Sequence, residues 1–216
     1  MLPSMDLLTT ASGLAALARA LHVGLAAFWV GTLFLLTVLQ APLLATADPA
    51  VRRAVLDGQG RPALRWLRGA ALATFVTGLA LFAVPGVGPS LDGALGAVLG
   101  SLMALNVWLL VSPGQEAVLA GREDAAAGAA RAHRTARTNL VLLGPALLFM
   151  VTSAHHPVGG RLVDASPLGL AGIALLVLAL EGNAIRGGLG PLASVAGALI
   201  ASLALAAACW GLLAFA

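Results

Sequence analysis

Several residue types that soluble domains rely on are scarce in this sequence. Only one cysteine is present, Cys209, which excludes an intrachain disulfide and any zinc or iron–sulfur site built from several cysteines. Charged residues make up only 10% of the 216 residues, and no lysine occurs, so all twelve basic residues are arginines. This composition excludes a soluble enzyme, and it favours arginines that report membrane topology over arginines that bind nucleic acid.

Apolar residues are abundant instead, at 60% of the chain, and the mean hydropathy is +0.97. They form continuous runs of membrane-spanning length rather than the short alternating segments of a β-barrel. The sequence therefore predicts an all-α polytopic membrane protein, folded as a single helical-bundle domain over residues 1–216. Six spans are expected, at Leu14–Leu44, Leu64–Val84, Leu91–Val111, Leu140–Ala154, Leu168–Leu180 and Leu192–Phe215.

The fifth expected span is short. It is followed by the polar segment Glu181–Gly188, so a re-entrant or strongly tilted segment is an alternative to a full crossing. Glu181 itself lies at the end of this span, where its carboxylate is expected to reach the interface and be solvated. The stretch Ser112–Thr138 is rich in charges and turn formers and is interpreted as a loop.

The arginines are unevenly distributed between the two sides of this bundle. With six spans, both termini share one side with Arg19 and Arg161. The other side holds the remaining ten, which are Arg52, Arg53, Arg61, Arg65, Arg68, Arg122, Arg131, Arg134, Arg137 and Arg186. These ten are interpreted as solvated topology markers, and the positive-inside rule makes their side cytoplasmic. We therefore expect both termini to be external, which is the periplasm if the membrane is the inner membrane of a bacterium. Met1–Thr10 carries no basic residue, so a cleaved signal peptide is not expected.

The stretch Leu21–Phe34 is a hydrophobic helix that contains a histidine. An ionisable side chain within an apolar span is costly, so His22 is by default a candidate functional residue that needs a partner. Trp29 lies seven residues after His22 and therefore on nearly the same helix face, with the small Gly31 beside it. This face is predicted to hold a flat cofactor or a metal ion, with His22 and Trp29 in contact with it.

Topology selects the histidines that can join His22. The fourth span ends in Thr152–Pro157, which places His155 and His156 on the same side of the membrane as His22, whereas His133 lies on the opposite side and is discounted. His22 lies about eight residues, or ~12 Å, inside its span. Because that span is longer than the hydrocarbon core is thick, tilting can bring His22 level with the end of the fourth span.

Two cofactors suit these histidines. Neutral imidazole is a standard axial ligand of haem iron, and His22 with His155 from a facing helix suffices for a bis-histidine haem b. Copper usually needs a third ligand, which His156 supplies if the helix ends here, as Pro157 indicates. The metal-ligand candidates are therefore His22, His155 and His156, with haem b favoured and copper as the alternative.

Asn106 is another polar residue inside a predicted span. Its side-chain amide must find a hydrogen-bond partner across the bundle, because lipid offers none. A role in joining helices is therefore expected for Asn106.

Several segments together resemble a known family. They are Leu21-His22 with Trp29-Val-Gly31, Asn106-Val-Trp108 with Pro113-Gly-Gln115, Arg137-Thr-Asn139 with Pro145, and Ser153-Ala-His155-His156-Pro157. In this order, over roughly residues 20–157, they resemble the membrane domain of the bacterial cytochrome-c-linked urate hydroxylase (urate oxidase) family. The first segment alone also resembles the copper resistance D family. The main resemblance implies cofactor-binding roles for His22, Asn106, Asn139 and His155, and an oxidoreductase activity linked to urate oxidation.

The sequence departs from that family beyond these segments. The family has additional transmembrane helices and a cytochrome c domain, whereas this sequence contains no Cys-x-x-Cys-His haem attachment motif. A separate cytochrome c or a quinone is therefore expected as the electron partner. The leading hypothesis is a membrane redox protein with a bis-histidine haem b near the external face. The alternatives are a copper-binding or copper-transport protein and a cofactor-free subunit of a larger respiratory complex.

Overall fold

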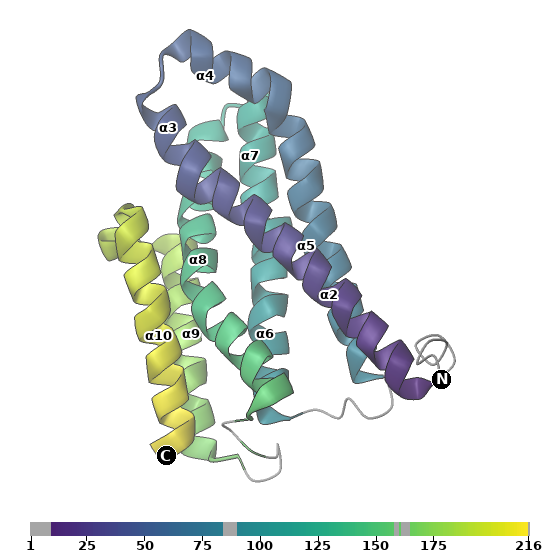
Figure 1. The fold of residues 1–216 in the computed structure, drawn as a ribbon. Coiled ribbons are helices and arrows are strands. Elements are labelled where there is room, and N and C mark those ends of the chain that lie inside the picture. The colour runs from purple at the N-terminus through teal and green to yellow at the C-terminus, as the bar shows by residue number, and fades with distance from the viewer. Residues whose placement is uncertain (1–9, 84–89, 158–159, 161–164, 216) are drawn as a thin grey trace.

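The computed structural model of the chain describes residues 10–83, 90–157, 160 and 165–215, and Figure 1 shows that they form a bundle of long helices. Within the described residues the regular elements are helices and helical turns, and no strand is present. Successive long helices run in opposite directions through the bundle, from α2 to α10 (Figure 1). The predicted all-α fold class is confirmed.

The element bounds follow the chain in order. The first crossing combines helix α2 (Ala11–Phe34), the π-helical turn η1 (Leu35–Gln40) and helix α3 (Ala41–Thr46). Helix α4 (Pro49–Val55) and the π turn η2 (Leu56–Gly60) lead into α5 (Arg61–Phe82). The next crossing joins α6 (Leu91–Asn106), the π turn η3 (Val107–Val111) and α7 (Ser112–Leu119). The remaining elements are α8 (Ala125–His155), α9 (Pro167–Arg186), the 3-10 turn η5 (Gly190–Ala193) and α10 (Val195–Phe215).

Five helices of the described chain are long and apolar enough to cross a membrane. They are Ala11–Thr46, Leu91–Leu119, Ala125–His155, Pro167–Arg186 and Val195–Phe215. The expected second span corresponds to α5, which is not among the five and carries three arginines in its first eight residues. Helix α5 packs along α2 and runs in the opposite direction to it, beside the spanning helices. Val84, the expected end of that span, lies outside the described residues. These helices support a multi-pass membrane protein.

The interpretation of Ser112–Thr138 as a loop is wrong. Helix α7 continues the third span to Leu119 and α8 begins at Ala125, so only a short turn separates them. The start of α8 is rich in alanine, the strongest helix former, and α8 packs closely on α7. A Cβ at Gly114 of α7 would overlap the carbonyl oxygen of Gly128 in α8. Helix propensity and this close packing outweigh the charges that suggested a loop.

The fifth span is a complete helix rather than a re-entrant segment. Helix α9 has 20 residues, a length of about 30 Å, which matches the hydrocarbon core of a bilayer. Its start is well defined, because Ser166 Oγ accepts a hydrogen bond from the N–H of Gly169 at 3.2 Å and Pro167 occupies the first turn. The polar residues after Leu180 continue this helix instead of ending it.

Each π turn lies shortly before a proline. The turns η1, η2 and η3 end two residues before Pro42, Pro62 and Pro113, respectively. Proline has no N–H to donate to the carbonyl four residues earlier, and in each case that carbonyl lies within the π turn. We attribute the widened turns to these missing donors. Pro145 lies inside α8 without a π turn, and the N–H of the preceding Gly144 donates to Ser202 Oγ of α10 at 2.9 Å.

Helix α8 lies at the centre of the packing and contacts α6, α7, α9 and α10. Its buried side chains include the polar Asn139 as well as the apolar Phe149. Large apolar side chains on other helices face outward, such as Leu168 on α9 and Leu203 on α10, which are 73% and 71% exposed. Soluble proteins rarely expose extensive apolar surface, so contact with lipid accounts for this surface.

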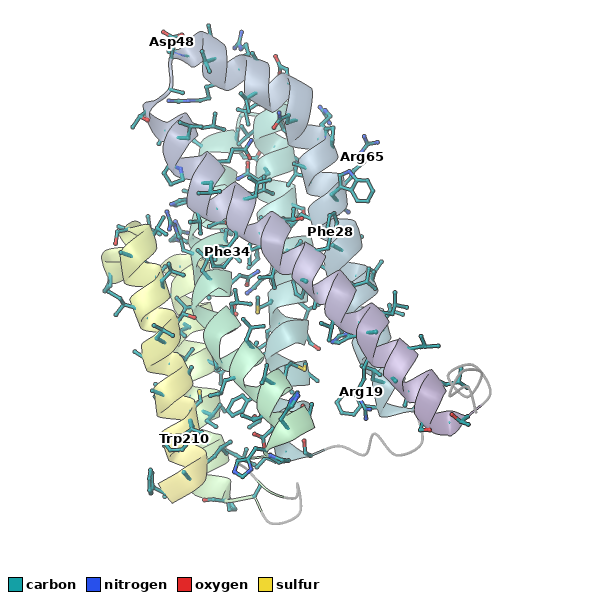
Figure 2. All side chains as sticks on the ribbon, viewed as in Figure 1. Arg19, Phe28, Phe34, Asp48, Arg65 and Trp210 are labelled. Carbon is teal, nitrogen blue, oxygen red and sulfur yellow. The ribbon has the colours of Figure 1, made fainter. Side chains whose placement is uncertain are left out.

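The described arginines lie mostly at one end of the bundle. Figure 2 labels Arg65 toward that end, near which Asp48 also lies, and Arg19 toward the opposite end. The two ends of the described chain, at the start of α2 and the end of α10, share the end of Arg19 (Figure 1). The predicted separation of charge is therefore observed for the described residues, and Arg161 lies outside them. The periplasmic location of the termini stays a prediction.

Candidate functional site

His22 lies on α2 where this helix packs against α5. Its Nδ1 is 3.0 Å from Thr77 Oγ1, and the Thr77 hydroxyl donates to the carbonyl oxygen of Ala73 at 2.7 Å. Because the hydroxyl hydrogen is directed at a backbone carbonyl, the Thr77 oxygen accepts and His22 Nδ1 donates. This tautomer places the imidazole lone pair on Nε2, which is the arrangement that a metal-ligating histidine needs.

The ring of His22 rests against a glycine of α5. A Cβ at Gly78 would lie 2.9 Å from His22 Cε1, so a larger residue there would displace the imidazole. The sequence alone indicated no functional role for Thr77 or Gly78. Their role depends on the register between α2 and α5, which the sequence does not specify.

Trp29 lies about two turns beyond His22 and is 4% exposed, within the main apolar core. Its indole Nε1 has no hydrogen-bond partner among the described residues. Leaving a buried donor unpaired costs about 1–3 kcal/mol. The indole N–H of Trp29 is therefore a free donor among the described residues, and its contact with a group bound at His22 stays a prediction.

His155 and His156 lie at the exposed end of α8. The helix ends at His155, and His156 has φ −156° and ψ 80°, so the expected helix end before Pro157 is confirmed. His155 Nδ1 is 3.0 Å from the carbonyl oxygen of Val151, which only accepts, so His155 Nε2 also carries the lone pair. The adjacent rings are no longer held at the helical offset of about 100° between neighbours.

The structure does not bring His22 and His155 together. Helix α2 packs on α5, and its oblique course separates its first half from the C-terminal end of α8 (Figure 1). The first crossing contacts α8 chiefly through η1, which begins thirteen residues, or about 20 Å of helix, beyond His22. Imidazole–metal bonds of about 2 Å require two ligating nitrogens about 4 Å apart across one metal. Each ring fits the ligand role by itself, and the predicted pair is not assembled.

His22, His155 and His156 do not form a group either. Among the described residues, no three side chains of histidine, cysteine, aspartate or glutamate lie close enough to hold a metal ion. A role for all three in one copper site stays a prediction. His133 lies in the first half of α8, near the arginine-rich end, consistent with its exclusion from a site that contains His22.

Asn106 and Asn139, the two asparagines implied by the family resemblance, are in direct contact. Asn106 Nδ2 donates to Asn139 Oδ1 at 2.9 Å and to Glu181 Oε1 at 2.8 Å. Asn139 Nδ2 donates to the carbonyl oxygen of Met103 at 3.0 Å. Both asparagines are buried, and these bonds join α6, α8 and α9. The expected role of Asn106 in helix contact is confirmed.

Glu181 was misplaced by sequence reasoning. It was expected to be solvated at the interface, but it is half-buried and accepts the hydrogen bond from Asn106. The expectation is wrong because α9 extends to Arg186, which leaves Glu181 inside a helix rather than at its end. The signal that could have found it is the general one applied to His22, namely an ionisable residue within a spanning helix.

Arg137 is a second correction. The sequence predicts a solvated topology marker at this position, yet Arg137 is 3% exposed, and its Nε and Nη1 have no hydrogen-bond partner among the described residues. The position belongs to the interior of α8, which begins four turns earlier than expected. A buried guanidinium without a counter-charge is costly, so Arg137 is a candidate to contact an anionic group.

Replacing Asn106 by alanine should lower the stability of the bundle. The change removes two hydrogen bonds and leaves Glu181 without the donor from α6, for an expected loss of about 1–2 kcal/mol. Reversible unfolding in mixed detergent micelles measures it. Ser101→Ala is the matched control on α6, because the Ser101 hydroxyl donates only within its own helix, to the carbonyl of Ala97 at 2.6 Å. Equal losses in both variants would contradict a stabilising role for the network.

Comparison of the chain with family models, with curated proteins and with solved structures finds no match. The resemblance to the urate hydroxylase membrane domain therefore stays a prediction, carried by the residues quoted for it.

Proposed function

We propose that the protein is a membrane-embedded redox protein that binds haem b through His22. The observation that supports this most is the hydrogen bond from His22 Nδ1 to Thr77, which fixes the ring and directs the lone pair to Nε2. A histidine in a spanning helix is itself an indicator of function. Haem b, when bound, supplies a one-electron couple that the side chains of this chain lack.

The residues around His22 support the binding of such a group. Thr77 orients the imidazole, Gly78 leaves room for it, and Trp29, two turns further along α2, offers a buried N–H that has no partner among the described residues. In this proposal His155, whose ring has the same tautomer, would be the second residue to hold the haem. Because α2 and α8 are apart at this end, binding through both histidines requires α2 to move toward α8.

The proposal includes the setting of the protein. It places the chain in a bacterial inner membrane with both termini in the periplasm, so that a cytochrome c or a quinone can exchange electrons near the external face. The link to urate oxidation comes from the family resemblance, and an oxidoreductase activity is proposed on that ground.

The absorption spectrum of the purified protein tests the proposal. We expect a Soret band and sharp α and β bands after reduction, because two imidazole ligands keep haem iron low-spin. Extraction in acidified acetone should yield non-covalently bound haem, since the sequence has no Cys-x-x-Cys-His motif. The proposal would be contradicted if the protein, purified from cells supplied with a haem precursor, showed no Soret band and no α or β band.

Copper binding is the second candidate function, supported by a different observation. His155 and His156 are adjacent, exposed and at a helix end, where their rings can approach one ion. Elemental analysis of protein without haem bands distinguishes the two functions, and stoichiometric copper that His155→Ala removes would favour this one. A protein with neither haem nor copper would favour the third hypothesis, a cofactor-free subunit of a respiratory complex.

A further inference from the structure

A groove with a volume of about 320 Å³ lies between α5 and α7 at the arginine-rich end of the bundle. It is lined by Arg61, Leu64, Arg65 and Arg68 of α5 and by Glu116 of α7. The three arginines are four and three residues apart, so they share one face of α5. With one carboxylate opposite three guanidinium groups, the lining carries a net charge of +2 at neutral pH.

Two of these arginines are held in place by contacts within the bundle. Arg68 Nη1 forms an ion pair with Glu116 at 2.5 Å, and its guanidinium stacks over Trp108 with Cζ 4.3 Å from the ring centroid. Arg61 Nη2 donates to the carbonyl oxygen of Leu119 at 3.3 Å. These contacts fix two of the positive groups that line the groove, and Glu116 neutralises only one of its three positive charges.

Arg65 differs from its two neighbours. It is exposed and has no hydrogen bond or ion pair to any residue that the structure describes. Its guanidinium therefore keeps all its N–H donors for a ligand in the groove. A guanidinium matches the oxygen atoms of a phosphate in two parallel hydrogen bonds, which makes phosphate the preferred ligand of this arrangement.

The depth of the groove in the membrane is indicated by an aromatic pair. Trp66 follows Arg65 in the chain, is 64% exposed, and packs edge-to-face on Phe28 of α2 with ring centroids 5.8 Å apart. Exposed tryptophan in membrane proteins is enriched at the level of the lipid headgroups. Arg65 is therefore at a depth where lipid phosphates are concentrated.

We infer that this groove binds the phosphate group of an anionic phospholipid, with Arg65 as the main ligand and Arg61 and Arg68 beside it. Basic pockets between transmembrane helices are a known means of binding such headgroups. Free phosphate presents the same oxygen atoms, and the bilayer level of the groove favours the lipid as its source. Binding here is independent of any cofactor at His22.

Native mass spectrometry of the detergent-purified protein tests the inference. Dioleoyl phosphatidylglycerol is titrated against dioleoyl phosphatidylcholine, and inorganic phosphate is titrated separately and as a competitor. We expect preferential binding of phosphatidylglycerol, with an affinity about fivefold lower in Arg65→Gln and about thirtyfold lower in Arg61→Gln/Arg65→Gln. Gel filtration of each variant establishes that the bundle is intact.

Two variants with the same change of charge serve as controls. Arg131→Gln alters an exposed arginine near the same end of the bundle but outside the groove, and Arg19→Gln alters one near the opposite end. Both should bind phosphatidylglycerol as the unmodified protein does. An equal loss in Arg131→Gln would overturn the site in favour of diffuse surface charge. If the protein binds inorganic phosphate but not the lipid, and Arg65→Gln weakens that binding, the groove is a phosphate site and the lipid is overturned as its ligand. If the protein binds neither ligand, the inference is overturned.

Discussion

His22→Ala is expected to abolish the low-spin haem spectrum of the purified protein. The substitution removes the only imidazole on α2, and iron left with one axial ligand or none becomes high-spin or is lost. Thr77→Val keeps the ring and removes its hydrogen-bond acceptor, so haem affinity should fall by about 10–100-fold while some low-spin protein remains. Reduced-minus-oxidised difference spectra and haem titration measure both effects.

The matched control is His133→Ala, which removes a histidine from the first half of α8 and should leave the spectrum unchanged. Because His22→Ala also leaves a cavity, gel filtration must show folded protein, and free imidazole should restore part of the low-spin signal. A folded His22→Ala protein with an unaltered low-spin spectrum rules out His22 as a ligand. If His155→Ala retains that spectrum and His156→Ala loses it, the second ligand is the neighbouring residue.

A second large effect is expected from Gly144→Ala in the centre of α8. The added Cβ would lie 2.6 Å from the carbonyl oxygen of Ser202, a backbone atom that cannot rotate away, so α8 and α10 must separate. The N–H of Gly144 would also lose its bond to the Ser202 hydroxyl. We expect a loss of about 3 kcal/mol or failure to accumulate in the membrane, measured by unfolding in mixed micelles and by membrane yield.

Gly100→Ala is the corresponding control, because a Cβ at Gly100 on α6 meets nothing within 4 Å. Alanine is the better helix former by up to about 1 kcal/mol, so this variant should be as stable as the unmodified protein or slightly more so. Similar stabilities of the two variants would show that α8 and α10 are not packed as closely as described.

The helical bundle was predictable because the apolar runs are longer than the helices of a soluble fold require. The first and sixth spans are recovered as helices within a few residues of their expected bounds, and the third begins at Leu91 as expected but continues past Val111 to Leu119. The start of the fourth span was not predicted correctly. The turn after α7 is only a few residues long, and α8 begins among charged residues that suggested a loop. Charged side chains indicate contact with water, but they do not mark the end of a helix. A helix that extends beyond the hydrocarbon core can contain charged residues in its outer turns.

The candidate site was predictable only as a set of residues. His22 and Asn106 stand out as polar groups in apolar surroundings, whereas Asn139 was implied only by the family resemblance, and the two asparagines do meet in the core. Their partners Thr77 and Glu181 depend on which faces α2 and α9 turn inward, and no periodicity in these apolar helices specifies that. The separation of His22 from His155 likewise follows from the tilt of α2, which depends on packing rather than on composition.

The π turn η3 determines which residues of one continuous helix face α8. Asn106 before it and Gly114 after it both meet α8, at Asn139 and Gly128. Eight residues of uninterrupted α-helix turn through about 800°, which would leave Asn106 and Gly114 about 80° apart. The wider turn absorbs about one extra residue, or about 100° of rotation, and returns both to nearly one direction. Pro113 therefore determines which side of α7 faces α8. Without it, a residue with a side chain would face Gly128, where there is room only for a glycine.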